Sequence, residues 1–283
     1  MLEYPEIKTI ARQMQSILPG KFISQIEFPG LERKFVFSHQ DEAAFQARLG
    51  GNTIDHITSC GNHLFIYTDQ GVVLNIGDTG GKLLFTEAGK TPPKKFDLKV
   101  IFEDGSTLTH SIQMWGFLDA QTADEAKAHQ QHILDEAREP FEDRVTLEGF
   151  LDWLHNWEEA PKVNAKKFII SRKYFTGIGN GYTQDILWKA KLHPRRKMDT
   201  LNQDEATALF HAFREIVQKA VEQDGRDTEH DLFNEPGKYA VLLGNKTLGA
   251  PCLACGTEII KFSFEGGACY ICPTCQVDPR TSK

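Results

Sequence analysis

The segment that decides the fold of this chain, residues 252–275, reads CLACGTEIIKFSFEGGACYICPTC. It holds two Cys-x-x-Cys pairs, separated by sixteen residues, whose members are Cys252, Cys255, Cys272 and Cys275. Each pair forms a tight turn that directs two thiolates at one point, and four thiolates make up a closed tetrahedral zinc site. We therefore predict one structural Zn²⁺, held by these four cysteines without an activated water.

An overlapping pair leaves an alternative for the third ligand. Cys269 and Cys272 are also spaced as Cys-x-x-Cys, so Cys269 could compete for the metal. We favour Cys272 with Cys275 because Pro273 lies inside that turn, as in many zinc ribbons.

Length and composition describe a folded, water-soluble chain. Its 283 residues correspond to roughly two domains, and 40% are hydrophobic and 25% charged. No run of about 18 apolar residues is present, and the acidic start of the chain lacks the cationic and apolar parts of a signal sequence. We expect a monomer in a bacterial-type cytoplasm, with no membrane partner.

Charge is unevenly distributed along the chain, although the net charge is only −7. Residues 121–160 contain eleven acids and three bases, whereas residues 161–197 contain ten bases and one acid. A basic block of this size in an acidic protein is typical of a surface that binds phosphates, although a solvated helix face is the alternative. The ten bases are Lys162, Lys166, Lys167, Arg172, Lys173, Lys189, Lys191, Arg195, Arg196 and Lys197.

The hydrophobic pattern predicts an α+β protein that changes from strands to helices near residue 120. After a helix at 5–18, short alternating runs predict strands of a sandwich or barrel. We expect domains at 1–120, 121–237 and 238–283. Strands are predicted at 21–28, 33–38, 62–68, 71–76, 81–86, 96–103, 106–112, 257–264 and 267–272, and helices at 122–137, 146–157, 162–174, 182–191 and 202–224.

A glycine-rich turn connects two of the predicted helices inside the basic block. Thr176-Gly177-Ile178-Gly179-Asn180-Gly181 precedes a helix that starts near Tyr182. The glycines permit a tight turn, Asn180 could cap the second helix, and its first backbone N–H groups form an anion site. We interpret the motif as a phosphate-binding helix–turn–helix.

The order of these parts resembles the formamidopyrimidine-DNA glycosylase and endonuclease VIII family. The resemblance spans essentially the whole chain. The fragments that carry it are Glu3-Tyr4-Pro5-Glu6, residues 176–182, Asp185-Ile186-Leu187-Trp188, His193-Pro194 and the cysteine segment ending in Gln276. It implies a two-domain protein that clamps duplex DNA, flips a damaged base and cuts its glycosidic bond. It also implies a helix–two-turn–helix domain and a zinc finger on a C-terminal β-hairpin.

The resemblance fails at the residue that performs the family's chemistry. Family members begin, after removal of Met, with a proline whose amine attacks the sugar, followed by a glutamate that assists. Here Leu2 and Glu3 occupy those two positions, and Glu6 matches a second family glutamate. Because leucine is large, we expect Met1 to be retained, so that the nitrogen of Leu2 is an amide without a nucleophilic lone pair. The α-amine of Met1 then lies one residue beyond the expected place.

Other family positions differ as well. Asn62 stands where the family has a phosphate-contacting lysine, and Gly267 stands near the family's finger arginine. Met114 and Trp115 replace the Arg-Phe wedge that fills the space of the flipped base. Gly179, Asn180 and Tyr182 belong to the segment that matches the family's helix–two-turn–helix. We predict that the residues contacting DNA are Gly179, Asn180, Tyr182, Lys167, Asn62, Met114 and Trp115.

Three functions are compatible with this pattern. The first is a base-excision glycosylase with altered chemistry, in which Glu3 assists a water and Glu6 or the Met1 amine contributes. The second is an inactive module that recognises damaged or distorted DNA, with Glu3 and Glu6 serving only as helix N-terminal acids. The third is a module that binds structured RNA. The sequence does not specify which lesion is recognised.

Overall fold

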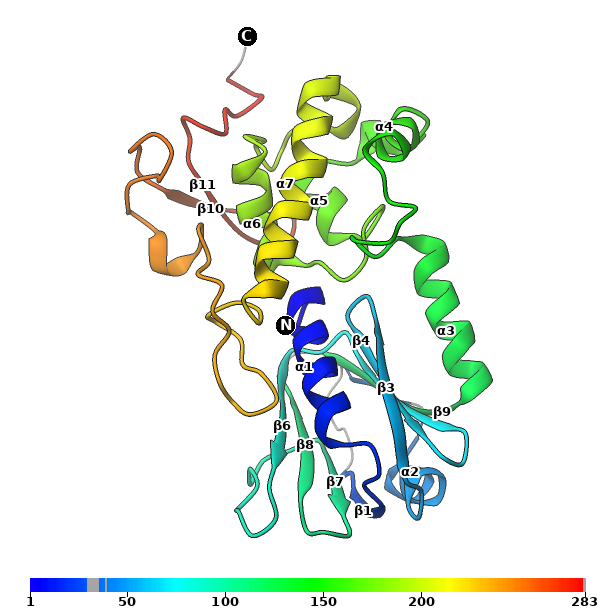
Figure 1. The fold of residues 1–283 in the computed structure, drawn as a ribbon. Coiled ribbons are helices and arrows are strands. Elements are labelled where there is room, and N and C mark those ends of the chain that lie inside the picture. Colours follow the sequence, from blue (N-terminus) through cyan, green and yellow to red (C-terminus); the bar gives the residue numbers. More distant parts are fainter. Residues whose placement is uncertain (30–35, 39, 114, 282–283) are drawn as a thin grey trace. The chain divides into compact units, whose positions relative to one another are not determined.

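The computed structural model describes residues 1–29, 36–38, 40–113 and 115–281, and its chain divides into two units (Figure 1). The first unit comprises Met1–Ile133 and Val221–Tyr239. The second comprises Leu134–Ala220 and Ala240–Lys283. Among the described helices, none combines the length and apolar composition needed to cross a bilayer.

The first unit opens with helix α1 (Tyr4–Ile17). Glu3 and Glu6 form a capping box at its start, and Pro5 occupies the first turn, where its missing N–H costs nothing. Apolar residues at helical spacing, including Ile7, Ile10 and Met14, are fully buried. The apolar face of α1 therefore packs into the core that the strands form.

Two sheets form the sandwich of the first unit. One is four-stranded, in the order β1-β7-β8-β6, and the other is five-stranded, in the order β2-β9-β5-β4-β3. All pairings are antiparallel except β2 with β9. The strands are β1 (Ile23–Glu27), β2 (Val36–Phe37), β3 (Ile54–Cys60), β4 (His63–Thr68), β5 (Val72–Gly77), β6 (Gly81–Thr86), β7 (Leu98–Phe102), β8 (Thr107–Ile112) and β9 (Gly116–Thr122).

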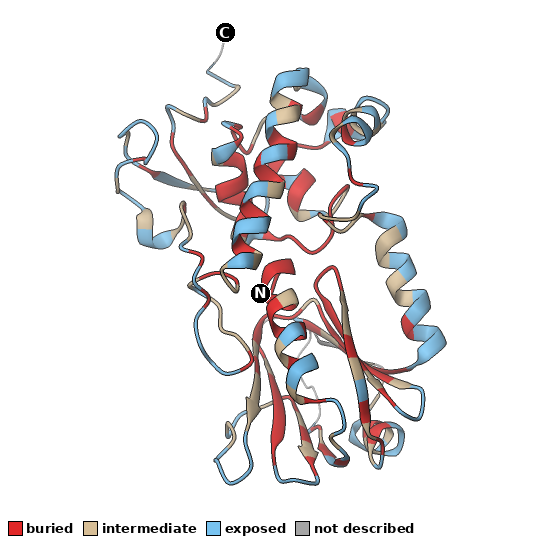
Figure 2. Cartoon of the chain, viewed as in Figure 1, coloured by how far each residue is buried: buried red, intermediate tan, exposed pale blue. Residues whose placement is uncertain are grey.

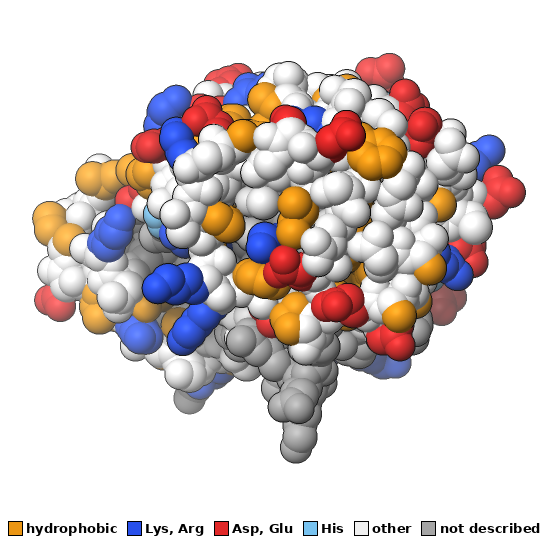
Figure 3. All heavy atoms as spheres, turned by 90° about the horizontal axis from the view of Figure 1, so that it is seen from below, with side chains coloured by type: hydrophobic (Ala, Val, Ile, Leu, Met, Phe, Trp, Pro, Cys, Tyr) orange, Lys and Arg blue, Asp and Glu red, His pale blue; other side chains and the backbone are white. Residues whose placement is uncertain are grey.

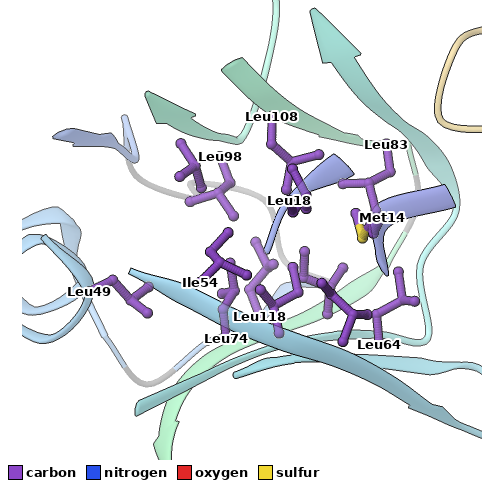
Figure 4. Close-up of a cluster of buried hydrophobic side chains, with 14 of the residues drawn as sticks. Met14, Leu18, Leu49, Ile54, Leu64, Leu74, Leu83, Leu98, Leu108 and Leu118 are labelled. Carbon is purple, nitrogen blue, oxygen red and sulfur yellow. The ribbon is translucent and has the colours of Figure 1, made fainter. Parts of the chain in front are cut away.

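The core of this unit lies between the two sheets. In Figure 4, Leu83, Leu98 and Leu108 from one sheet approach Leu64 and Leu74 from the other, and side chains of α1 fill the space between them. Helix α2 (Glu42–Leu49) closes the end of the sandwich with buried side chains. Burial of this many aliphatic groups is the main stabilising contribution, because each removes apolar surface from water.

The second unit is helical and carries a two-stranded hairpin. An aromatic cluster centred on Phe150 forms much of its core, with Phe210 and Phe213 of α7 among its members. Figure 2 shows the buried stripe of α7 beside its exposed face. Its elements are α4 (Leu147–His155), α5 (Ala165–Ile170), α6 (Asn180–Lys189), α7 (Gln203–Glu222), β10 (Ile260–Phe264) and β11 (Gly267–Ile271), and α3 (Ala123–Glu136) leads into it.

The α+β architecture confirms the fold class predicted from the sequence. Several local features differ from the prediction. Strands β3 and β9 and helix α2 were not predicted, and the helix expected at 162–174 is only α5, because Arg172 adopts a positive φ of 54°. Of the strand expected at 33–38, residues 33–35 lie outside the described residues. Residues 221–239 belong to the first unit, whereas most of them fall in the helical domain predicted at 121–237.

Candidate metal cluster, nucleic-acid interface and N-terminal site

The four predicted cysteines come together at one end of the second unit. The sulfurs of Cys252, Cys255, Cys272 and Cys275 all lie within 4.8 Å of one another. Individual Sγ–Sγ distances are 3.9 Å, 3.4 Å and 3.5 Å, and a tetrahedral Zn²⁺ with bonds of about 2.3 Å separates its sulfurs by about 3.8 Å. The donor set and its spacing therefore fit a zinc ion. Cys269 is fully buried and is not part of the cluster.

The cysteine cluster is attached to helix α6 by side chains of that helix. Trp188 Nε1 donates to the sulfur of Cys252 at 3.3 Å. The buried carboxylate of Asp185 accepts from the backbone N–H groups of Leu242 and Leu243 at 2.9 Å and 2.8 Å. These buried and part-buried contacts connect α6 to the segment that carries the cysteines.

Gln184 fixes the β10–β11 hairpin against the same helix. Its Nε2 donates to the carbonyl of Ala268 at 3.2 Å, and its Oε1 accepts from the N–H of Tyr270 at 3.3 Å. A Cβ placed on Gly267 would lie 3.8 Å from the side chain of Asn180. The glycine turn before α6 and the turn of the hairpin therefore lie next to each other.

The role predicted for Asn180 as a helix cap is wrong. Gly179 is the N-cap of α6, and Asn180 is the first helical residue. The exposed Asn180 side chain instead accepts a hydrogen bond from Gln184 Nε2 at 3.1 Å. The reason is that Gly179 has extended backbone and Gly177 a positive φ of 81°, so the chain enters the helix one residue earlier.

Five of the ten basic side chains in the block are buried, paired with acids or stacked on aromatic rings. Lys166 is 1% exposed, and its Nζ donates to the carbonyl of Phe264 at 2.8 Å. Three further bases are paired with acids of the same unit, and Arg195 lies over the rings of Phe262 and Phe264. These ion pairs are Lys173–Glu159, Lys189–Glu215 and Arg196–Glu205.

Four lysines of the block remain exposed, and within the described part of the chain none of them forms an ion pair. They are Lys162, Lys167, Lys191 and Lys197. Tyr182, in contrast, is 0% exposed, so its side chain belongs to the core of the unit and does not reach the surface.

Acidic and basic side chains both reach the face drawn in Figure 3, so the net negative charge does not make that face uniformly acidic.

The N-terminal residues of the first unit are held in place by buried contacts. The backbone N–H of Leu2 donates to the carbonyl of Thr79 at 2.9 Å, and its side chain is 1% exposed in the sandwich core. The α-amine of Met1 forms an ion pair with Glu229 at 3.0 Å. The nitrogen of Leu2 is therefore a hydrogen-bonded amide.

Arg226 connects the charged and polar groups of this site, and no sequence pattern identified it in advance. Its guanidinium contacts Glu3 at 3.3 Å and Glu6 at 3.2 Å, and it donates to the carbonyl of Met1 at 2.7 Å. Glu3, Glu6 and Arg226 are at most 5% exposed, so the two carboxylates depend on the guanidinium for stabilisation in a buried environment. Gly225, with a φ of 89°, brings the chain so close that a Cβ would lie 2.9 Å from Glu6.

A second polar group surrounds Asn62. This residue is 1% exposed, and its Nδ2 donates to Asp78 Oδ1 at 2.8 Å, while the other oxygen of Asp78 lies 3.5 Å from His63 Nε2. The Asn62 side chain is thus buried in a local network and is not presented as a phosphate ligand. Trp115 is 43% exposed, and Met114 lies outside the described residues.

Two histidines near these residues are neutral at pH 7. Burial, with a smaller contribution from the neighbouring His63, lowers the pKa of His129 to about 4. Burial lowers the pKa of His110 to about 3, and its Nε2 lies 2.7 Å from the hydroxyl of Thr79. Neither imidazole therefore adds a positive charge to this polar network at pH 7.

Comparison with solved structures identifies the scaffold. The Fpg of Lactococcus lactis, crystallised with DNA containing an abasic site, superposes with a TM-score of 0.85 at 23% identity, covering 98% of this chain and 100% of that protein. The MutM (Fpg) protein of Thermus thermophilus superposes with a TM-score of 0.81 at 23% identity, covering 97% of this chain and 98% of that protein. The chain therefore has the same fold as these two proteins.

Sequence comparison carries the assignment further. Residues 1–134 match the formamidopyrimidine-DNA glycosylase N-terminal domain, and residues 137–231 match the formamidopyrimidine-DNA glycosylase H2TH domain. The formamidopyrimidine-DNA glycosylase of Streptococcus pneumoniae (strain ATCC BAA-255 / R6) is 29% identical over 287 residues, covering 98% of this chain and 99% of the relative. That of Bacillus anthracis is 26% identical over 285 residues, with the same coverage. The chain belongs to the formamidopyrimidine-DNA glycosylase and endonuclease VIII family.

Proposed function

We propose that this protein binds duplex DNA with a damaged or distorted base and does not form a Schiff base through its N-terminus. It acts as a cytoplasmic monomer. The observation that carries the proposal is the amide of Leu2, which donates to Thr79 in the sandwich core where the family has its reactive amine.

The second unit supplies the binding surface in this proposal. Gly179 and Asn180 begin α6 beside the hairpin turn, and Lys167 is among the exposed lysines nearby in sequence. Backbone N–H groups at a helix start and lysine side chains bind phosphates without reading bases. Zinc held by the four cysteines keeps the hairpin and α6 together; when bound it supplies structure, because four thiolates complete its coordination.

In this proposal the N-terminal site does not supply nucleophilic chemistry. A Schiff base requires an amine within about 3–3.5 Å of the sugar carbon, and one added residue moves the α-amine of Met1 by about 3.8 Å of chain. That amine is also engaged by Glu229. The carboxylates of Glu3 and Glu6 are engaged by Arg226, so they contribute to the structure of this site.

Borohydride trapping tests the chemical half of the proposal. Purified protein, whose intact mass establishes whether Met1 is present, is incubated with abasic-site and oxidised-base duplexes and borohydride. We expect no covalent adduct and no base release. A near-stoichiometric adduct mapped to the α-amine of Met1 would overturn the proposal. Base release without an adduct would instead indicate hydrolysis through Glu3, which Glu3→Gln would abolish.

Titration of labelled nucleic acids tests the binding half. We expect lesion duplexes to bind more tightly than plain duplex or structured RNA, with affinity falling as salt increases because phosphate contacts release counterions. Asn180→Ala should weaken binding to every DNA sequence alike. Tighter binding of structured RNA, or affinity independent of salt, would reject duplex DNA as the partner.

A further inference from the structure

Helix α4 presents an apolar face that the second unit covers only in part. Leu147, Leu151 and Leu154 recur at helical spacing, yet each remains partly exposed, and Phe150 is the buried residue of this nine-residue helix. A surface helix of a globular protein normally buries such a stripe. The face of α4 therefore has the composition of an interface.

A groove of about 810 Å³ runs along this face. It lies between α4, the 3₁₀ turn Ala160–Lys162 and the segment that leads into α7, and Trp157, Met198 and Leu201 contribute apolar walls. A neighbouring hollow of about 630 Å³ beside Trp153 shares part of its lining. We call these two depressions together the α4 groove.

The rim of the α4 groove is acidic. Glu148, Asp152, Glu158, Glu159 and Asp199 line it, and neither depression is lined by a lysine or arginine of the described residues. All five carboxylates belong to exposed residues. Glu159 is paired with Lys173, and in the described part of the chain the other four form no ion pair. An apolar floor with a mostly unpaired acidic rim repels DNA phosphates and complements a cationic, amphipathic segment.

We propose that the α4 groove is a docking site for a basic amphipathic helix of a partner protein. Leucine-sized side chains of that helix pack on Leu151 and Trp157, and its lysines or arginines pair with Asp152 and Glu158. Figure 1 shows α4 and the β10–β11 hairpin at separate places on the second unit, so a partner and DNA occupy different surfaces. This inference does not depend on the chemistry at the N-terminus.

A designed peptide tests the proposal on the full-length, zinc-loaded protein. The probe is a fluorescein-labelled helical peptide of lysine and leucine, about 14 residues long so that it matches the typical length of a helix in a globular protein. A glutamate–leucine peptide of equal length is its counterpart. We expect anisotropy to show saturable binding of the basic peptide only, weakening with salt. The double variant D152K/E158K should lower this affinity by about tenfold or more, because it replaces two attractions by two repulsions.

The matched control is E103K/D143K, which changes the net charge equally at exposed acids outside the groove. Equal losses in both double variants, or equal binding of the glutamate–leucine peptide, would overturn the proposal.

Hydrogen exchange of the unsubstituted protein provides a second measurement. The peptide should protect residues 147–161 and leave 180–189 unchanged, and the reverse pattern would overturn the proposal. Sedimentation velocity addresses a second copy of the chain as the occupant. A dimer that forms with concentration and is lost in D152K/E158K would assign the groove to self-association and also overturn it.

Discussion

The N-terminal site of the first unit differs from the platform of the second unit in how its polar groups are used. The platform consists of α6 (Asn180–Lys189) and the β10–β11 hairpin (residues 260–271). In the N-terminal site, the acids Glu3 and Glu6 are buried against Arg226, and the nitrogen of Leu2 is a hydrogen-bonded amide. In the second unit, Gly179 begins α6 and the four cysteines remain close together. The charged groups of the N-terminal site are therefore engaged in buried contacts, whereas the second unit combines an exposed Asn180 with four cysteines that could hold a metal.

Removal of the metal should have the largest effect and should affect the two units differently. A structural zinc site contributes about 10–16 kcal/mol to the folded state of its module. We expect Cys255→Ser or chelation to unfold the hairpin segment and reduce DNA affinity more than about 100-fold, while the sandwich stays folded. Metal analysis with circular dichroism measures this. Cys269→Ala is the control, and loss of zinc in that variant would contradict the ligand assignment.

Replacement of Arg226 should have the next largest effect and should be confined to the first unit. Arg226→Met leaves the buried carboxylates of Glu3 and Glu6 without their cation, which we expect to lower the free energy of unfolding by about 3–5 kcal/mol. Urea denaturation measures the loss. Lys238→Met removes an exposed ion pair with Asp224 and should cost less than about 1 kcal/mol. Equal losses in the two variants would argue against a buried charge network.

Acid should destabilise the first unit through His110. The pKa of this imidazole is about 3 when folded, because of burial, and about 6.5 when unfolded. The unfolded chain therefore binds more protons between these values, and stability is fully present above pH 6.5 and falls as the pH drops. The contribution is about 2 kcal/mol between pH 7 and pH 5. His110→Gln should flatten this dependence, and an NMR titration showing a charged His110 at pH 5 would contradict it.

The smallest effect should come from restoring a cation to the platform. Gly267→Arg places a guanidinium beside Asn180, where a Cβ meets neighbouring side-chain atoms at 3.4 Å or more. We expect the slope of log affinity against log salt to steepen by about 0.9, with a severalfold gain in DNA affinity. Thr281→Arg, at an exposed position near the end of the chain, is the charge-matched control. An equal gain in both variants would mean that the platform does not contact DNA.

The features that could be predicted from the sequence are those with local patterns. The spacing of Cys252, Cys255, Cys272 and Cys275 predicts the cluster because each pair is one turn, and Pro273 favours the correct third ligand over Cys269. Helices α1 and α7 follow from apolar periodicity, and the glycines of 176–181 predict the turn before α6. Each signal lies within a few residues, so neighbouring side chains suffice to encode it.

The tertiary structure alone decided which charged and polar residues are available at the surface. Arg226 lies 220 residues from Glu6 in the chain. The sequence around a glutamate at a helix start is the same whether or not a distant arginine pairs with that glutamate. Lys166, Asn62 and Tyr182 look like surface ligands in the sequence, yet packing buries all three. The sequence by itself therefore determined the four-cysteine cluster, the helix turn and the family. Burial and long-range pairing determined which of its charges can meet a partner, because both depend on chain segments that only folding brings together.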